Sequence, residues 1–142
     1  MTKINALLSN LGNYMSALPS IEITALFAAI FGVVHVLFTL RVGMYRVSNN
    51  ISVGDGGDKE LLKRIRGHGN FIETVPMALL LLLLNELNGL ADTYLIILAS
   101  TLLVARLLHY SALALGGPQI FRPIGMIGTL LTILASSLLL FF

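Results

Sequence analysis

The protein has 142 residues, of which 56% are hydrophobic and 11% are charged, and its mean hydropathy is +0.89. So few charges cannot cover the surface of a soluble globule of this size, which excludes soluble folds and indicates an apolar solvent. The net charge of +2 is too small to indicate a nucleic-acid-binding surface. The chain has no cysteine, which excludes disulfides, thiolate metal ligands and a cysteine nucleophile, and we expect no bound metal.

Residues 1–18 form a first segment with its own pattern. Its apolar residues recur at helical spacing, which predicts an amphipathic helix lying at the membrane interface. A frayed chain terminus is the alternative interpretation. The apolar residues of this segment are Ile4, Leu7, Leu8, Leu11 and Met15. No sequence repeat divides the rest of the chain, so residues 19–142 are expected to form a single domain.

Four apolar stretches follow, and each is long enough to cross a hydrocarbon core of about 30 Å, which takes roughly 20 residues of helix. The first, third and fourth cover residues 21–40, 93–113 and 123–142. The second contains the uncharged run 74–84 and stops at Asn88-Gly89, within a helix expected over residues 59–88. Short polar connections join them. The expected fold is therefore an all-α membrane protein, a bundle of four transmembrane helices.

The second stretch is longer than a bilayer requires. A helix over residues 59–88 is roughly 45 Å long at about 1.5 Å per residue, so its basic first part, residues 59–68, is expected to project into water. Glu73 then lies inside the membrane. A charge in hydrocarbon costs at least about 2.5 kcal/mol, so Glu73 should face protein or a wet cavity and have a partner. Arg106 is the expected partner. The ion pair could stabilise the helix bundle, form part of a ligand site, or do both.

Four spans with short connections alternate in direction, so both chain termini are expected on one side of the membrane. The connections around residues 47–58 and 114–121 lie on the other side, together with most of the cations. The positive-inside rule makes this crowded side cytoplasmic. Its basic residues are Arg41, Arg46, Lys59, Lys63, Arg64, Arg66, Arg106 and Arg122. For Lys59, Arg64 and Arg46, an equally good interpretation is that they only reach toward lipid phosphates.

Two helix faces carry the polar residues of most interest. Lys63, Arg66, Asn70 and Glu73 are separated by 3, 4 and 3 residues, which places them on one stripe of the second helix.

On the third helix, Arg106, His109 and Tyr110 share a face in the same way. Interfacial anchoring is the alternative role for the histidine and the tyrosine. His35, in the middle of the first helix, is expected to hydrogen-bond between helices.

The run Arg66-Gly67-His68-Gly69-Asn70-Phe71-Ile72-Glu73-Thr74-Val75-Pro76 resembles the helix-two signature of the MAPEG superfamily, the membrane-associated proteins in eicosanoid and glutathione metabolism. The resemblance extends over residues 21–142. It includes Tyr45-Arg46-Val47, the Gly54-Asp55-Gly56-Gly57 link typical of bacterial members, the Arg106-Leu107-Leu108-His109-Tyr110 run and Arg122.

The resemblance implies a homotrimer of four-helix protomers in a bacterial inner membrane, with glutathione bound between neighbouring protomers near the cytoplasmic face. It implies that Arg66, Asn70 and Glu73 contact glutathione, that Arg106 and His109 lie near the same pocket, and that Arg122 faces the thiol. Arg41, Lys63 and Tyr110 are further candidate contacts. No metal is implied.

The chemistry of glutathione suits these residues. Its two carboxylates match Lys63, Arg66 and Arg41, and its ammonium group matches Glu73. A thiol with a pKa of about 8.5 is mostly protonated at neutral pH, and a nearby guanidinium such as that of Arg122 favours the thiolate. The second substrate is expected to be a lipophilic electrophile or a lipid hydroperoxide that arrives from the bilayer.

Three positions depart from the pattern of specialised eicosanoid synthases. These are Gly69, Leu113 and Pro123. Because the residues that such synthases carry at these positions are absent, the resemblance implies a broad detoxifying glutathione transferase or peroxidase. Two alternatives stay open: a protein of the same fold that binds glutathione or lipid without turnover, and a small four-helix exporter that uses an intramembrane carboxylate.

Overall fold

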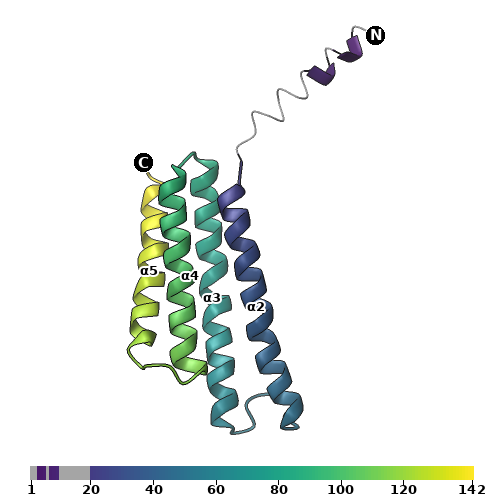
Figure 1. The fold of residues 1–142 in the computed structure, drawn as a ribbon, viewed down its shortest axis with the longest axis vertical. Coiled ribbons are helices and arrows are strands. Elements are labelled where there is room, and N and C mark those ends of the chain that lie inside the picture. The colour runs from purple at the N-terminus through teal and green to yellow at the C-terminus, as the bar shows by residue number, and fades with distance from the viewer. Residues whose placement is uncertain (1–2, 6, 10–19) are drawn as a thin grey trace.

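The computed structural model describes residues 3–5, 7–9 and 20–142. In this part of the chain there is no strand, and four long helices run side by side (Figure 1). They are α2 (Glu22–Ser48), α3 (Lys59–Leu87), α4 (Asp92–Ala114) and α5 (Phe121–Leu139). The predicted all-helical bundle of four helices is confirmed.

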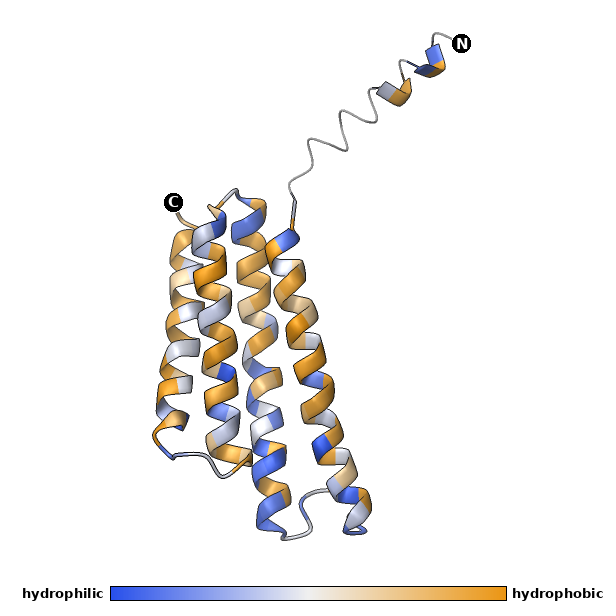
Figure 2. Ribbon diagram, viewed as in Figure 1, coloured by the Kyte–Doolittle hydropathy of each residue, from blue (hydrophilic) through white to orange (hydrophobic). Residues whose placement is uncertain are grey.

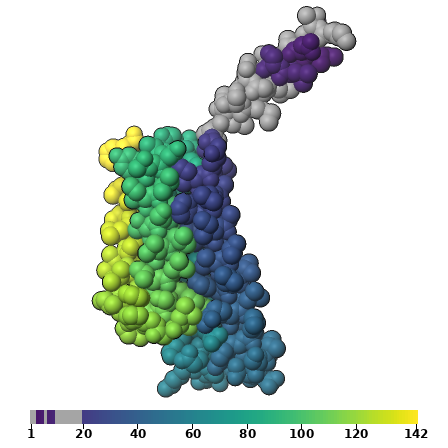
Figure 3. All heavy atoms as spheres, in the orientation of Figure 1, coloured from purple at the N-terminus to yellow at the C-terminus, as the bar shows by residue number. Residues whose placement is uncertain are grey.

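All four helices are long and apolar enough to cross a membrane. Figure 2 shows the hydrophilic residues gathered toward the end where α2 is joined to α3, whereas α5 is mostly hydrophobic. At this end α2 and α3 extend past α4 and α5, and the same projection is visible in the space-filling view (Figure 3). The arrangement agrees with the expectation that the basic start of α3 leaves the bilayer.

The helix boundaries differ from the prediction mainly in α2. This helix continues to Ser48, past the expected end at residue 40. Arg41 and Arg46 end the apolar stretch but not the helix, because a charged residue is a good helix former once the chain reaches water. The helix ends where Asn49 donates from its backbone N–H and from its side-chain Nδ2 to the carbonyl of Tyr45.

The connection between α2 and α3 is held by a small polar cluster. Asp58 caps α3 by accepting hydrogen bonds from the backbone N–H groups of Glu60 and Leu61, at 2.8 and 2.9 Å. Tyr45 donates its hydroxyl to the same carboxylate at 3.0 Å, and the guanidinium of Arg64 lies 4.3 Å from the centre of the Tyr45 ring. These contacts tie the ends of the two projecting helices together.

At the opposite end of the bundle, α3 caps α2. The Glu86 carboxylate accepts hydrogen bonds from the backbone N–H groups of Ile23 and Thr24, both at 2.8 Å, and only 8% of the residue is exposed. Ile21, at the N-cap position, offers no side-chain cap of its own. An anion at a helix N-terminus is favoured by the unpaired N–H groups and the helix dipole.

Aromatic packing fills the middle of the bundle. The ring of Tyr110 on α4 stacks on Phe38 of α2, with the centroids 3.4 Å apart, and Phe71 of α3 packs edge-on against Phe38. A Cβ atom at Gly67 would come within 3.0 Å of the Tyr110 ring, so α3 needs a glycine there. These contacts set the rotation of α3 relative to α4.

Among the described residues, the His35 side chain packs against α3 and does not make the expected interhelical hydrogen bond. Its ring lies against His68 and Phe71, with centroid distances of 5.2 and 6.2 Å. The hydrogen bond between α2 and α3 at this level joins Thr39 Oγ1 and His68 Nε2 at 3.1 Å. At this level of the described bundle, the hydrogen bond between α2 and α3 is therefore made by Thr39, which lies one helical turn after His35.

The predicted N-terminal interfacial segment is described only in pieces. Residues 3–5 and 7–9 are helical, and Ile4, Leu7 and Leu8 are exposed there. Leu11 and Met15, on which the amphipathic pattern also depends, lie outside the described residues. The interfacial helix stays a prediction.

Candidate functional site

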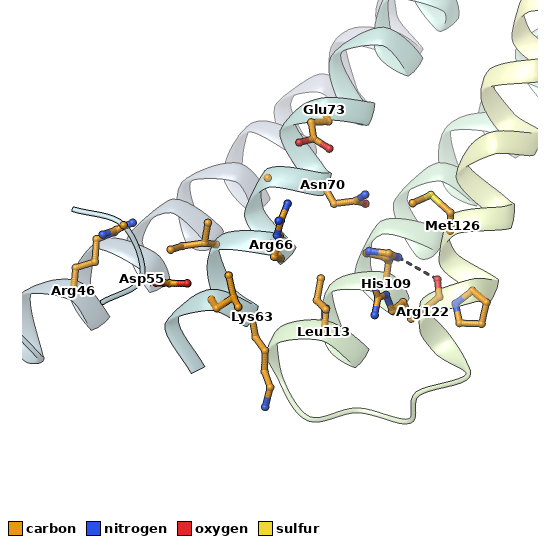
Figure 4. A pocket seen from close by; sticks show the side chains of 15 residues that line it. Arg46, Asp55, Lys63, Arg66, Asn70, Glu73, His109, Leu113, Arg122 and Met126 are labelled. Carbon is orange, nitrogen blue, oxygen red and sulfur yellow. Dashed lines mark hydrogen bonds between the residues drawn. The ribbon is translucent and has the colours of Figure 1, made fainter. Parts of the chain in front are cut away.

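A pocket of about 1120 Å³ opens near the projecting end of the bundle, with α3 on one side and α4 and α5 on the other (Figure 4). It gathers six of the nine candidate site residues of the sequence analysis. These are Lys63, Arg66, Asn70, Glu73, His109 and Arg122.

The α3 wall carries the polar stripe. Arg66 and Glu73 are exposed on the single chain, whereas Asn70 is half-buried. The 3, 4 and 3 spacing places these side chains along one side of the helix, from the basic end toward the middle of the bundle. Figure 4 shows Lys63, Arg66, Asn70 and Glu73 in successive turns along α3. Cations therefore line the outer part of the pocket and a carboxylate lies at its inner end.

The opposite wall is built around the start of α5. His109 of α4 is buried, and its Nδ1 is hydrogen-bonded to the backbone carbonyl of Arg122 at 3.1 Å (Figure 4). Because of this bond, the imidazole holds the first turn of α5 in place. The Arg122 side chain is left exposed at the pocket lining, at a helix N-terminus where the dipole is positive.

Close approach of α5 to α4 supports this wall. A Cβ atom at Gly125 would lie 2.8 Å from the Cβ of His109, a contact that forces the helices apart. Leu113, Pro123 and Met126 supply apolar surface on the same side. This side of the pocket thus combines the Arg122 guanidinium with apolar side chains.

Arg46 and Asp55 also line the pocket, and sequence reasoning did not assign either to it. Arg46 lies in the last turn of α2, and Asp55 lies in the connection to α3. That connection folds back along α3 through glycines with positive φ, such as Gly54 at 69° and Gly57 at 78°. The Gly54-Asp55-Gly56-Gly57 run was the signal that could have placed Asp55 at the site.

Arg106 is the most deeply buried of the candidate residues, with 2% of its surface exposed. Its guanidinium donates to Asn70 Oδ1, to Thr74 Oγ1 at 3.2 Å and to the carbonyl of Gly125 at 2.9 Å. It does not itself line the pocket, but it fixes Asn70, which does.

The expected ion pair between Glu73 and Arg106 is wrong. Asn70 and Thr74 lie one turn apart and face α4, whereas Glu73 is rotated by about 60° from Asn70 and about 100° from Thr74. This rotation turns Glu73 toward the pocket and leaves Arg106 with neutral acceptors. The ion pair found among the described residues joins Lys63 and Glu60 at 2.6 Å.

Tyr110 and Arg41 are not among the residues that line this pocket. Tyr110 is buried in the aromatic core against Phe38. Arg41 lines a second, smaller pocket instead. Of the nine candidates, the structure therefore keeps Arg41, Arg106 and Tyr110 outside the main pocket.

The pocket is suited to a zwitterionic ligand with an excess of negative charge. Its lining carries the cations Arg46, Lys63, Arg66 and Arg122 and the carboxylates Asp55 and Glu73. Within the described part of the chain no group of three or more histidines and carboxylates is placed to hold a metal ion.

Comparison with known proteins agrees with this architecture. The family model of the MAPEG family matches residues 24–142. The inner membrane protein YecN of Escherichia coli strain K12 is 38% identical over 89 residues, which is 62% of this chain and 67% of YecN. YecN of E. coli O6:H1 strain CFT073 matches with the same identity and coverage. No solved structure matches the chain.

Proposed function

Because the chain belongs to the MAPEG family, we propose that it is a membrane-bound glutathione transferase or peroxidase that acts on lipophilic electrophiles or lipid hydroperoxides. The observation that carries this proposal is the pocket itself. Guanidinium, ammonium and carboxylate groups from α3, α5 and the α2–α3 connection line one cavity of about 1120 Å³, next to apolar surface.

The charges of the lining complement those of glutathione. The two carboxylates of the tripeptide pair with Arg66 and Lys63, and its ammonium group pairs with Glu73. Asn70 offers a further polar contact, since Arg106 holds its side-chain oxygen and leaves the amide N–H₂ group free to donate. Tyr110 is not needed as a direct contact.

Arg122 is the proposed catalytic residue. A guanidinium close to the thiol stabilises the thiolate, and the N-terminus of α5 adds partial positive charge of the same sign. In the transferase reaction the thiolate sulfur bonds to an electrophilic carbon and the leaving group departs with its electron pair. In the peroxidase reaction a lipid hydroperoxide is reduced to an alcohol and water while two glutathione molecules become one disulfide.

The exposure of Glu73 favours an assembly of protomers, and we propose that this assembly is the homotrimer that the family resemblance implies. Glu73 is exposed on the single chain although it belongs to an apolar, membrane-spanning helix. Exposure of this charge to lipid costs at least about 2.5 kcal/mol, which a neighbouring protomer that covers the pocket avoids. Glutathione is then enclosed between protomers, and the lipophilic substrate enters from the bilayer. The relatives are named as an inner membrane protein, which supports the inner membrane as the location, and the positive-inside rule favours the cytoplasmic face for the basic pocket.

The test uses detergent-solubilised protein with glutathione. We expect the ultraviolet absorbance of bound thiolate, and conjugation of an activated aryl halide or reduction of a lipid hydroperoxide. Arg122→Ala should lose thiolate and turnover but keep most of the binding, whereas Lys59→Gln, which removes an exposed charge outside the pocket, should change neither. Binding without turnover on either substrate class would favour the non-catalytic binder. Absence of a glutathione signal at millimolar concentration would contradict the proposal.

A further inference from the structure

A second pocket of about 600 Å³ lies beside the first, at the projecting end of the bundle. It is lined by Arg41 of α2, by Lys63 and Arg64 of α3, and by residues from the end of α4 to the start of α5. The two pockets share Lys63, Leu113 and Arg122, so they are neighbours along one wall.

The charge of this pocket is strongly one-sided. It has four cationic side chains, Arg41, Lys63, Arg64 and Arg122, against the single carboxylate of Glu60. Glu60 is already paired with Lys63 at 2.6 Å. The C-terminal end of α4 contributes a further partial negative charge of about half a unit, which is too little to balance the remaining guanidinium groups.

Arg41 and Arg64 are held in place but incompletely paired. Arg64 stacks on the ring of Tyr45 and donates from Nη1 to the carbonyl of Arg41 at 3.4 Å. In the described part of the chain neither arginine has a carboxylate partner. The Nε atoms of both are buried without a hydrogen-bond partner there. A partly buried guanidinium with unused donors is stabilised by an anion that accepts hydrogen bonds in its plane.

Apart from Gln119, the rest of the lining is apolar or glycine. Ala112, Leu113, Ala114 and Leu115 form one side, and Leu115 is exposed. Since this end of the bundle lies at the membrane surface, a ligand with a charged head and hydrocarbon chains can satisfy both parts of the pocket.

We propose that this second pocket is a phosphate-binding site that holds the headgroup of an anionic membrane lipid between Arg41 and Arg64. Arginine is suited to this role because its planar donors match phosphate oxygens two at a time. The acyl chains continue along the apolar residues at the end of α4 into the cytoplasmic leaflet. The site does not depend on the proposed glutathione chemistry.

The test is lipid binding by the intact protein in detergent, without glutathione, followed by native mass spectrometry. Dioleoyl phosphatidylglycerol is titrated against the zwitterionic dioleoyl phosphatidylcholine. We expect the anionic lipid to be retained preferentially, and Arg41→Gln and Arg64→Gln to weaken its binding about tenfold each, as for the loss of one charged hydrogen bond.

Lys59→Gln is the matched control, since Lys59 is an exposed cation in the first turn of α3 and lines neither pocket. Its affinity for the anionic lipid should stay within about twofold of the unmodified protein, because a screened surface charge contributes little. An equal loss in all three variants would indicate only general attraction of anionic lipid to the basic end, and would overturn the proposal. Equal retention of both lipids would also overturn it.

A final arm separates lipid from free phosphate. The melting temperature of the detergent-solubilised protein is measured with inorganic phosphate and with sodium chloride at equal ionic strength. Stabilisation by phosphate that disappears in Arg64→Gln supports the phosphate site. If this occurs without preferential retention of the anionic lipid, the lipid assignment is overturned and free phosphate is the ligand.

Discussion

Arg106 and Asn70 are joined by a hydrogen bond from the guanidinium to the amide oxygen, between the middle of α4 and the pocket-lining face of α3. The contact gives a hydrogen-bond acceptor to a guanidinium that is almost fully buried. It also fixes the orientation of the Asn70 amide. One bond therefore serves both the stability of the bundle and the geometry of the pocket.

Replacement of Asn70 by leucine should destabilise the protein. Arg106 then loses one of its three acceptors while it remains buried, which costs about 1.5 to 3 kcal/mol for a hydrogen bond to a charged group. Thermal unfolding in detergent measures the change. Asn70→Asp keeps an acceptor and should retain most of the stability, and Asn88→Leu, at the exposed C-cap of α3, is the control. Equal melting temperatures for N70L and N88L would contradict the role of this bond.

Glu86→Ala should loosen the start of α2. The substitution removes the acceptor for two backbone N–H groups at a helix N-terminus, with an expected loss of about 1 to 2 kcal/mol. Hydrogen exchange at Ile23 and Thr24 should rise together with a fall in melting temperature. Glu22→Ala provides the comparison, because Glu22 is exposed in the first turn of the same helix. If the amides of Ile23 and Thr24 exchange in E86A as slowly as in the unmodified protein, the Glu86 carboxylate does not cap α2.

Gly125→Ala should separate α4 from α5. The new methyl group would meet the backbone of α4 and the Cβ of His109, and overpacking of this kind costs about 1 to 3 kcal/mol. Glutathione binding should weaken as well, since the start of α5 carries Arg122. Gly32→Ala is the control, because a methyl group there has open space and improves helix propensity by about 1 kcal/mol. Unchanged stability and binding in G125A would show that the helices are less closely packed than described.

The cap of α3 should make stability depend on acid pH. Hydrogen bonds to Asp58, first from the backbone N–H of Leu61, lower the pKa of this carboxyl below its usual value. Its stabilising contribution is therefore complete above the unfolded-state pKa of about 3.9 and is lost as the pH falls further, through the folded-state pKa. Asp58→Asn retains a capping side chain but no charge, so it should melt below the unmodified protein at neutral pH. The difference should shrink below about pH 4. A constant difference across this range would exclude the carboxylate as its source.

Periodicity and hydropathy predicted the four helices, including the length of α3, because a span of fixed thickness imposes a minimum run of apolar residues. They did not predict the extension of α2 to Ser48. Hydropathy marks the end of the bilayer rather than the end of a helix, and hydrogen bonds to Asn49 decide the latter.

The candidate site was predicted where residues share one helix, as in the stripe from Lys63 to Glu73. Contacts between helices were harder to predict. Arg106 is hydrogen-bonded to Asn70 rather than paired with Glu73 because of the rotation of α3 about its axis. The packing of Gly67 against Tyr110 sets this rotation. The Glu86 cap depends on which helix end lies opposite α2, and nothing local in the sequence reports that.

Recognition of glutathione by its charges is the property on which the proposed function of the main pocket depends. Calorimetric titration of the detergent-solubilised protein with glutathione, and with its diethyl ester, tests this directly, because the ester keeps the thiol and the ammonium group but lacks both carboxylates. We expect saturable binding of glutathione, and binding of the ester at least about tenfold weaker, since each lost charged hydrogen bond is worth about that factor. Equal affinity for the two ligands, or no binding of glutathione at millimolar concentration, would contradict this expectation.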